Sequence, residues 1–256
     1  MTKYIQIKQT VIGAGMPKIC VPITGIREDE IIQQAEQIAV GSPDLVEWRA
    51  DFFDGVESWP QVEKMLSTIS DKIGEIPLIF TFRTKKEGGE RQISLENYVN
   101  LNKMVSKTTC ADLIDVEVFQ EGAAVDSLVA VIHGNGKQVI ASNHHFCGTP
   151  DVNELLAIFR RMEDAGADIL KIAVMPKDEA DVLTLLEATS QMKRKSEKPL
   201  ITMAMSTLGT PSRICGEFFG SAVTFAAMGQ ASAPGQLEFG ALKTILNILH
   251  SIVPSS

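Results

Sequence analysis

Cysteine is scarce in this sequence, and the few cysteines form no motif. The 256 residues include four, at Cys20, Cys110, Cys147 and Cys215, and no two of them make a Cys-x-x-Cys pair. This scatter argues against a disulfide framework and against a zinc-ribbon site. We expect reduced cysteines and a cytoplasmic location.

Long apolar runs and an excess of basic residues are also missing. No uninterrupted apolar stretch is long enough to cross a bilayer, and residues 1–8 lack the apolar segment of a signal peptide. We therefore expect no membrane association and no secretion. The chain has 24 Lys and Arg against 32 Asp and Glu, a formal net charge of −8. Because phosphate backbones require basic patches, we expect no nucleic-acid partner.

The sequence does contain a regular alternation of apolar, strand-like runs with longer amphipathic segments. Eight such runs occur, at residues 18–24, 44–51, 76–84, 111–118, 137–146, 167–174, 199–206 and 221–227. Eight βα units in about 250 residues predict an α/β fold of the closed (β/α)8 or TIM-barrel type, not an open doubly wound sheet. The glycine fingerprint of the Rossmann fold is also missing. We expect one barrel domain over residues 1–256.

Residues 1–17 form an extension before the first barrel strand. Within it, residues 4–16 contain two short extended pieces, and Gly13-Ala14-Gly15 is a turn signal between them. We expect an N-terminal β-hairpin that closes the bottom of the barrel.

Lys171 lies in the middle of the apolar run 167–174, where a buried strand should carry no charge. A lysine is rarely fully buried unless it is paired or reactive. Desolvation lowers the pKa of a buried lysine, so that its free amine can attack a carbonyl. An imine-forming enzyme is the first hypothesis. The alternative is that Lys171 lies at a solvent-exposed end of a short strand.

Polar residues recur near the ends of the predicted strands. In a (β/α)8 barrel the catalytic groups come from the carboxyl ends of the strands, so alternation along each strand predicts which side chains face inward. The inward set comprises Glu47, Arg49, Arg83, Asp115, Glu117, Ser142, one of His144 and His145, Lys171, and either Met203 and Met205 or Ala204. We expect the polar members to converge at one end of the barrel.

These residues also have plainer interpretations. Glu47 with Arg49, or Glu117 with a neighbouring arginine, would form structural ion pairs. Met203 and Met205 suit packing, because methionine fills irregular gaps in cores. Adjacent histidines on a strand diverge, which makes joint ligation of a metal awkward, and we expect no metal site.

Six motifs follow one another at barrel-repeat spacing. They are Glu47-Trp48-Arg49-Ala50-Asp51, Phe82-Arg83 with Glu87-Gly88-Gly89, Ser142-Asn143-His144, Ile169-Leu170-Lys171-Ile172-Ala173, Met203-Ala204-Met205-Ser206 and Ser232-Ala233-Pro234-Gly235-Gln236. Together they closely resemble type I 3-dehydroquinate dehydratase, from about residue 17 to the C-terminus. The resemblance implies a homodimeric (β/α)8 barrel that dehydrates 3-dehydroquinate to 3-dehydroshikimate in the shikimate pathway, without metal or organic cofactor.

The resemblance also implies roles for individual residues. Lys171 forms an imine with the C3 ketone, and the protonated imine takes up electrons when C2 loses its proton. His144, oriented by Glu87, is the general base at C2 and returns the proton to the departing C1 hydroxyl in a syn elimination. Arg213 is the candidate for a bidentate pair with the substrate carboxylate. The substrate-binding set is Glu47, Arg49, Arg83, Arg213, Ser232 and Gln236, with Met203 and Met205 as further candidates.

Two other functions stay open at this point. An aldolase-like, imine-forming barrel acting on sugar phosphates should have a glycine-rich phosphate cradle after strands seven and eight, where this sequence has Arg213 and residues 232–236. A non-catalytic barrel that serves as a binding module should lack at least one of Lys171, His144 and Glu87, and all three are present. A further hypothesis is that the glycines of the 229–240 loop let it close over the substrate.

Overall fold

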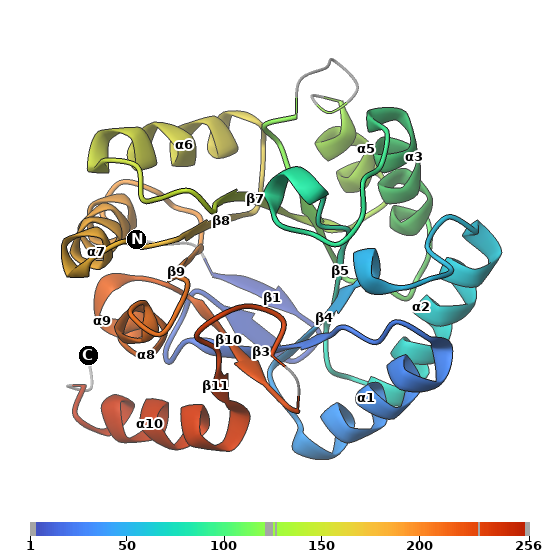
Figure 1. The fold of residues 1–256 in the computed structure, drawn as a ribbon, viewed down its shortest axis with the longest axis horizontal. Helices are drawn as coiled ribbons and strands as arrows, with labels where there is room; N and C mark the ends of the chain where they lie inside the picture. The colour runs from blue at the N-terminus through green and yellow to red at the C-terminus, as the bar shows by residue number, and fades with distance from the viewer. Residues whose placement is uncertain (1–3, 121–124, 126, 230, 254–256) are drawn as a thin grey trace.

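Eight parallel strands form the inner layer of the molecule (Figure 1). The computed structural model describes residues 4–120, 125, 127–229 and 231–253; residues 1–3 of the N-terminal extension and residue 230 of the 229–240 loop lie outside this range. The strands are β3 (Lys18–Ile23), β4 (Leu45–Arg49), β5 (Leu78–Thr81), β6 (Leu113–Val116), β7 (Gln138–His145), β8 (Ile169–Val174), β9 (Leu200–Ala204) and β10 (Val223–Ala227). Each lies within one of the eight predicted runs, so the predicted barrel strands are confirmed.

The barrel closes between β9 and β10. Parallel pairing is continuous from β10 through β3 and on to β9. At the remaining seam, Leu200 bridges Ser221, and the backbone N–H of Ala222 donates to the Leu200 carbonyl at 2.7 Å. The Thr202 N–H donates to Ser221 Oγ at 3.0 Å. A serine side chain therefore supplies part of the pairing that a backbone ladder supplies between the other strands. Beyond the seam, β11 (Leu237–Glu238) pairs with the end of β10.

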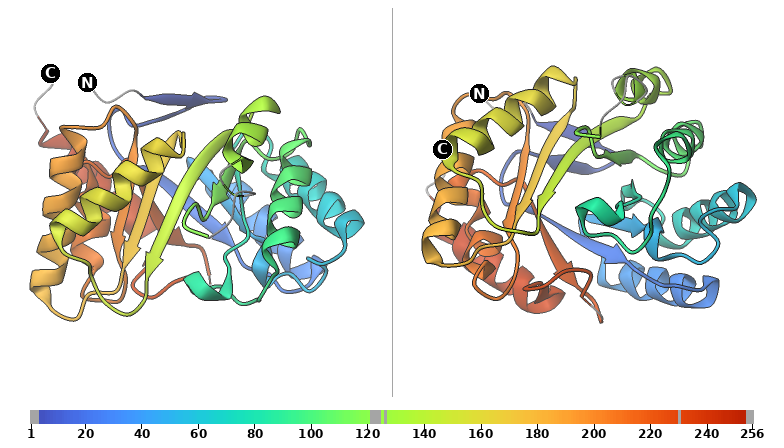
Figure 2. Two further views of the ribbon diagram at one scale, coloured as in Figure 1. Left: turned by 90° about the horizontal axis from the view of Figure 1, so that it is seen from above. Right: turned by 45° about the horizontal axis from the view of Figure 1, so that its top comes forward.

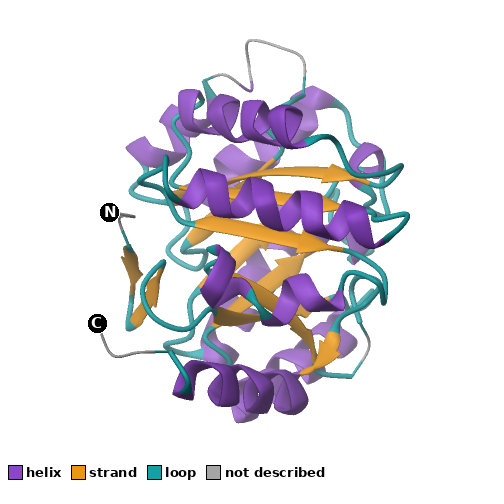
Figure 3. Ribbon diagram, turned by 90° about the vertical axis from the view of Figure 1, so that its left-hand side faces the viewer, coloured by secondary structure: helices purple, strands orange, loops and turns teal. Residues whose placement is uncertain are grey.

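Helices cover the outside of the barrel, with the strands enclosed between them (Figure 3). They are α1 (Glu28–Gly41), α2 (Trp59–Ile73), α3 (Leu95–Ser106), α5 (Leu128–Gly134), α6 (Val152–Asp164), α7 (Glu179–Lys193), α8 (Thr210–Ile214), α9 (Gly216–Phe219) and α10 (Phe239–Ser251), with 3-10 turns η1 (Ala50–Phe52) and η2 (Lys85–Glu87). Ser94, Asp151 and Asp178 cap α3, α6 and α7 by accepting a backbone N–H three residues on. Within the described ranges, no helix is long and apolar enough to cross a membrane.

Strand alternation separates two environments. Outward-facing Trp48 and Phe80 are fully buried under the helices, edge to face with ring centroids 5.7 Å apart. Inward-facing side chains at the amino ends of the strands, such as Leu45 and Ile79, form an apolar layer inside the barrel. The inward-facing charged side chains of the strands, such as Glu47 and Lys171, lie at the other end.

The N-terminal hairpin covers this apolar layer. β1 (Ile5–Ile7) pairs antiparallel with β2 (Thr10–Ile12), and Ile7 and Ile12 are buried in the same cluster as the interior of the barrel. Figure 2 shows the hairpin across the end from which the strands start, with the strand arrows pointing away from it. The predicted hairpin at the bottom of the barrel is confirmed.

The turn of the hairpin is not at the predicted position. The sequence predicts it at Gly13-Ala14-Gly15, but the chain reverses at Lys8 and Gln9, where Lys8 has φ of 50°. Gly13 and Gly15, with φ of 100° and 67°, instead turn the chain between β2 and β3. The prediction was wrong because a lysine occupies the left-handed position; its Nζ lies 3.1 Å from the Asp112 carboxylate, which helps to hold it there.

Three aspartates each link two adjacent strands at the end of the barrel that the hairpin covers. Each precedes one strand and accepts a backbone N–H near the start of the strand before it. The pairs are Asp44 with Ile19, Asp112 with Leu78 and Asp168 with Val139, all at 2.8 Å. These carboxylates satisfy N–H groups at the strand starts.

Replacing Ile12 with alanine should open a cavity between the hairpin and the apolar layer, because Ile12 is 0% exposed. We expect the free energy of unfolding to fall by about 2–5 kcal/mol, measured by urea denaturation. Val11→Ala, at a half-buried position on the opposite face of β2, is the matched control and should lose less. Equal losses in the two variants would contradict a hairpin that seals the barrel.

Candidate active site

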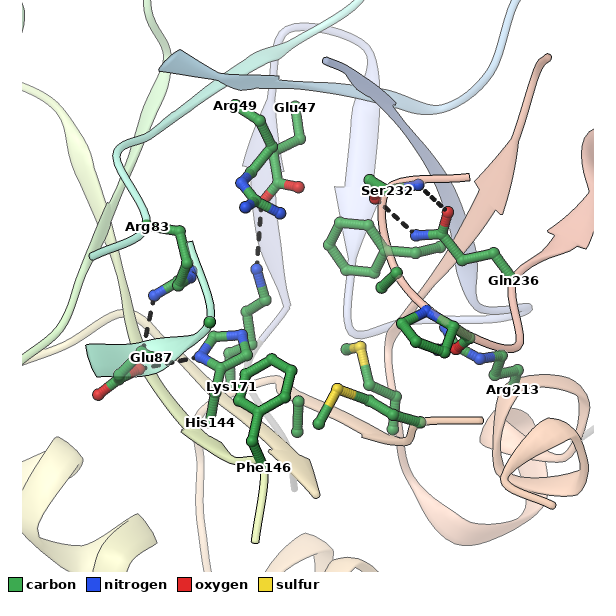
Figure 4. A pocket seen from close by; sticks show the side chains of 17 residues that line it. Glu47, Arg49, Arg83, Glu87, His144, Phe146, Lys171, Arg213, Ser232 and Gln236 are labelled. Carbon is green, nitrogen blue, oxygen red and sulfur yellow. Dashed lines mark hydrogen bonds and ion pairs between the residues drawn. The ribbon is translucent and has the colours of Figure 1, made fainter. Parts of the chain in front are cut away.

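The carboxyl ends of the strands surround a pocket (Figure 4). The described residues that line it are Glu47, Arg49, Arg83, Glu87, Gly88, His144, Phe146, Lys171, Ala173, Met203, Met205, Arg213, Phe225, Ser232, Ala233, Pro234 and Gln236. The structure therefore brings together every residue that the sequence predicts for catalysis or substrate binding.

Lys171 lies inside the barrel on β8 and is 4% exposed. Its Nζ is 3.0 Å from Asp115 Oδ2 and 3.1 Å from Glu47 Oε1. The same nitrogen lies 4.8 Å from the centroid of the Phe225 ring, in a cation–π contact. The alternative of a solvent-exposed lysine at the end of the strand is wrong.

The protonation of Lys171 differs from the expectation. Burial lowers its pKa, but the negative charges of Asp115 and Glu47 outweigh burial and raise the pKa above its usual value. The predicted lowering is therefore wrong for this site, because the lysine is buried together with two carboxylates. Lys171 is a charged ammonium here and must lose a proton before it can act as a nucleophile.

Arg83 also binds Asp115, at the base of the pocket. It is 3% exposed, and it donates to Asp115 Oδ1 at 2.8 Å, Glu117 Oε1 at 3.0 Å and Ser142 Oγ at 2.8 Å. The structural ion pair considered for Glu117 is thus present. Burial raises the pKa of Asp115, but Arg83 and then Lys171 more than compensate and lower it to about 2. Asp115 is ionised between two cations.

His144 and Glu87 form a hydrogen-bonded pair beside Lys171 (Figure 4). Nδ1 of His144 lies 2.9 Å from Glu87 Oε2, and the Asn143 side chain donates to Glu87 Oε1 at 3.3 Å. Burial, followed by the positive charges of Arg83 and Lys171, lowers the pKa of His144 well below its usual value. Burial and the Glu117 charge raise the pKa of Glu87 to about 8. His144 is therefore a neutral imidazole at neutral pH. While Glu87 keeps its proton and donates it to Nδ1, the ring hydrogen lies on Nε2; once Glu87 is ionised, Nδ1 carries the hydrogen and Nε2 is free to accept a proton.

Arg49 does not form the ion pair with Glu47 that was one interpretation of the sequence. Its Nε and Nη2 donate to the two carboxylate oxygens of Asp51, each at 2.8 Å. Glu47 instead accepts from Lys171 and from Thr81 Oγ1, the latter at 3.0 Å. Arg49 thus pairs two residues further along the chain, whereas Glu47 pairs across the barrel with β8 and with the neighbouring strand β5.

Among the described cations of the pocket, the guanidinium of Arg213 has the fewest hydrogen-bonded nitrogens. It is 2% exposed, and its Nη2 donates to the Pro234 carbonyl at 3.1 Å. Within the described part of the chain, its Nε and Nη1 are buried without a hydrogen-bond partner. Burial lowers the pKa of Arg213 to about 10. A buried guanidinium with two free donor atoms is suited to a carboxylate ligand.

The loop beside Arg213 presents polar groups to the same pocket. The Ser232 N–H donates to Gln236 Oε1 at 2.9 Å, and Gln236 Nε2 donates to Ser232 Oγ at 2.8 Å. Met203 and Met205 contribute buried apolar surface from the end of β9. In the part of the chain that the structure describes, no three His, Cys, Asp or Glu side chains are grouped in a way that would hold a metal ion.

Comparison with known proteins assigns the chain to a family. The family model for type I 3-dehydroquinase matches residues 19–253. The chain belongs to the type I 3-dehydroquinase family. The 3-dehydroquinate dehydratase of Clostridioides difficile is 47% identical to it over 99% of this chain and 100% of that relative.

Solved structures support the same assignment. The type I 3-dehydroquinate dehydratase from Clostridium difficile superposes with a TM-score of 0.96 at 46% identity, over 99% of this chain and 100% of that one. The 3-dehydroquinate dehydratase from Geobacillus kaustophilus also gives 0.96, at 38% identity and 98% coverage of both chains. The confirmed fold and the family agree with the resemblance drawn from the sequence.

Three further residues, not predicted from the sequence, shape this site. Phe225 contacts Lys171, Phe146 stacks on His144 with ring centroids 6.5 Å apart, and Asp51 holds Arg49. Inward alternation along β10 would have indicated Phe225. Phe146 stands two residues after His144, so the same alternation, continued past the end of β7, would have indicated it.

The two shifted pKa values of the His144–Glu87 pair can be measured by nitrogen NMR of the histidine ring. We expect no imidazolium at pH 6.5, because burial and the neighbouring cations disfavour it. As the pH rises through about 8, Glu87 loses its proton and the Nδ1 signal should shift. Glu87→Gln should abolish this shift of the Nδ1 signal. The signal should be missing in His144→Ala, which assigns it to His144. A single midpoint near the usual histidine value would contradict the burial argument.

Proposed function

We propose that this pocket dehydrates 3-dehydroquinate to 3-dehydroshikimate through an imine on Lys171, with His144 as general base and general acid. The lyase activity in the shikimate pathway follows from membership of the type I 3-dehydroquinase family. The assignment of each step to a residue is our own. One observation carries it: a buried lysine, a neutral histidine held by a carboxyl group, and an unpaired buried arginine line one pocket.

Arg213 is assigned to the substrate carboxylate. Its Nε and Nη1 lie on different edges of the guanidinium, and the second N–H of Nη2 can complete a bidentate pair with one of them. The carboxylate would supply the partner that the buried guanidinium lacks. Gln236 and Ser232, on the adjoining loop, together with Arg49 and Glu47 across the pocket, are assigned to the ring hydroxyls. Arg83 already binds Asp115, Glu117 and Ser142, so we assign it to fixing charge at the base of the pocket.

Imine formation begins with the loss of a proton from Lys171. Asp115 is a weak base because its pKa is about 2, so we assign the proton to Glu47, whose Oε1 lies 3.1 Å from Nζ. The neutral amine then adds to the C3 carbonyl. Glu47 returns its proton to the oxygen of the adduct, and loss of that oxygen as water gives a protonated imine. The Clostridium difficile relative was solved with covalent modified comenic acid, which supports a reactive nucleophile in the family.

His144 is assigned to both proton transfers. As a neutral imidazole it takes the C2 proton, and the electrons of that C–H bond move into the protonated imine. The imidazolium then gives its proton to the C1 hydroxyl, which leaves as water on the same face of the ring. Hydrolysis of the imine releases 3-dehydroshikimate and restores Lys171. This requires Glu87 to be ionised: it then accepts the Nδ1 hydrogen, which leaves Nε2 without a hydrogen and available for the substrate.

The two rival functions fit the pocket less well. A barrel that cleaves sugar phosphates would need a phosphate cradle at this end, where the chain instead presents one buried arginine and the Ser232–Gln236 pair. A non-catalytic binding module gives no reason to bury a lysine beside a neutral histidine. Dehydration through Lys171 uses both features.

Three further properties are proposed with the function. The resemblance implies a homodimer and a cytoplasmic location, and light scattering would distinguish the homodimer from a 27.9 kDa monomer. Closure of the 229–240 loop over the substrate is the third. Proteolysis of this loop that is unchanged by bound ligand would count against closure.

Borohydride trapping tests the assignment of Lys171 and His144. Incubation with 3-dehydroquinate and borohydride should give an adduct confined to the Lys171 peptide, detected by mass spectrometry. Lys171→Ala should show neither adduct nor turnover, whereas His144→Ala should still form the adduct and turn over about 10²–10⁴-fold more slowly. Lys195→Ala, at an exposed position after α7, is the control. Undiminished turnover in Lys171→Ala would refute the mechanism.

Substrate binding tests the assignment of Arg213. In Arg213→Ala we expect KM for 3-dehydroquinate to rise about 10–100-fold, because a charge-assisted bidentate pair is lost. Arg194→Ala, at the exposed end of α7, should leave KM unchanged. A normal KM in Arg213→Ala would place the substrate carboxylate elsewhere in the pocket.

A further inference from the structure

We propose that Asp51 is a positioning residue that fixes the substrate-binding Arg49 and the loop carrying Glu87 in one arrangement. Asp51 takes no part in the chemical steps above and does not line the pocket. The inference rests on the proposed roles of Arg49 and Glu87. The new element is that substrate binding by Arg49 and the orientation of His144 by Glu87 both depend on the Asp51 carboxylate.

The Asp51 carboxylate is 0% exposed and accepts four hydrogen bonds. Oδ1 accepts from Arg49 Nε at 2.8 Å and from the backbone N–H of Arg83 at 3.2 Å. Oδ2 accepts from Arg49 Nη2 at 2.8 Å and from the backbone N–H of Glu90 at 3.1 Å. Each oxygen thus joins one side-chain donor from β4 to one backbone donor from the segment after β5.

The two backbone donors stand on either side of Glu87. Between them the chain forms a closed loop: the Gly89 N–H donates to the Thr84 carbonyl at 2.9 Å, and the Lys85 N–H to the Arg91 carbonyl at 3.1 Å. An added Cβ at Gly89 would overlap the Arg83 carbonyl, so the loop closes too tightly for a side chain there. Since Asp51 holds both ends of this loop, it sets the position of Glu87 relative to β4.

Asp51 restricts Arg49 in the same way. Two of the three guanidinium nitrogens bind the carboxylate, and the guanidinium carbon lies 5.0 Å from the centroid of the Phe52 ring. Only Nη1 has no bond to Asp51, and it is left for a ligand. On the other side, Arg91 Nε donates to the Asp51 carbonyl at 3.1 Å, which fixes the backbone of η1.

The plainer interpretation is that Asp51 simply neutralises a buried arginine. That role predicts a loss of stability in an Asp51 variant, with kinetics unchanged in the protein that remains folded. A positioning role predicts two kinetic changes together, one in substrate binding through Arg49 and one in proton transfer through Glu87 and His144.

Asp51→Asn separates these interpretations. The carboxamide keeps the shape but turns one acceptor into a donor that faces N–H groups, so one side of the four-bond arrangement is lost. We expect KM for 3-dehydroquinate to rise and kcat to fall, each about tenfold. In the wild type, kcat/KM should rise with pH through about 8, as Glu87 ionises and Nε2 of His144 becomes the free base. In Asp51→Asn this inflection should move away from the wild-type position.

Asp112→Asn is the matched control, because Asp112 also accepts a strand N–H but lies at the opposite end of the barrel. It should lose stability and keep the wild-type KM, kcat and pH profile. Should Asp51→Asn not fold, Arg91→Ala decides: Arg91 is partly exposed, and loss of its bond to Asp51 should lower kcat/KM about fivefold and move the same inflection.

A folded Asp51→Asn protein with the wild-type KM and pH inflection would overturn the proposal, whatever its stability. So would a fall in kcat with neither of those changes. Borohydride trapping distinguishes a failure of the positioning role of Asp51 from a failure of the proposed function. An adduct on Lys171 in both wild type and Asp51→Asn leaves the proposed function standing, and its absence from the wild type would count against the function itself.

Discussion

Two buried cations share one buried carboxylate at the carboxyl ends of β5, β6 and β8. Arg83 lies 2.8 Å and Lys171 3.0 Å from the oxygens of Asp115. Burying unpaired charge is costly, so these groups must meet as the barrel closes. Their meeting decides the chemistry of the pocket: it keeps Asp115 ionised and Lys171 protonated, and together with burial it holds His144 neutral.

The three arginines of the pocket differ in what they contact, and those contacts separate their roles. Arg83 is saturated by carboxylates at the base, and Arg49 is held along one edge by Asp51. Arg213 is equally buried but keeps two donor atoms free. Among the described arginines of the pocket, Arg213 is therefore the cation that is left to pair with an anion. Binding there satisfies a group that folding leaves unsatisfied.

Alternation along the strands predicted most of the pocket correctly. Period-two alternation is set by the backbone, so Glu47 and Arg49 face inward and Trp48 outward whatever the neighbouring strands contain. The errors concern pairing between strands. Asp115 and Lys171 are 56 residues apart in the sequence, and no local pattern indicates that two carboxylates converge on the lysine. The position of the hairpin turn was predicted wrongly for a related reason. Lys8, which is held by the distant Asp112, takes the left-handed position that local rules assign to glycine.

The sequence by itself determined the βα repeat, the inward-facing residues and the family resemblance, because each depends on local periodicity or on motif order. Only the tertiary structure decided which charges pair, and therefore the protonation of Lys171, the neutrality of His144 and the freedom of Arg213. It also decided that Asp51, an outlying member of the Glu-Trp-Arg-Ala-Asp motif, contacts the loop of Glu87. The physical reason is that hydrogen bonds and buried charges act over a few ångströms of space, and closure of the barrel sets those distances.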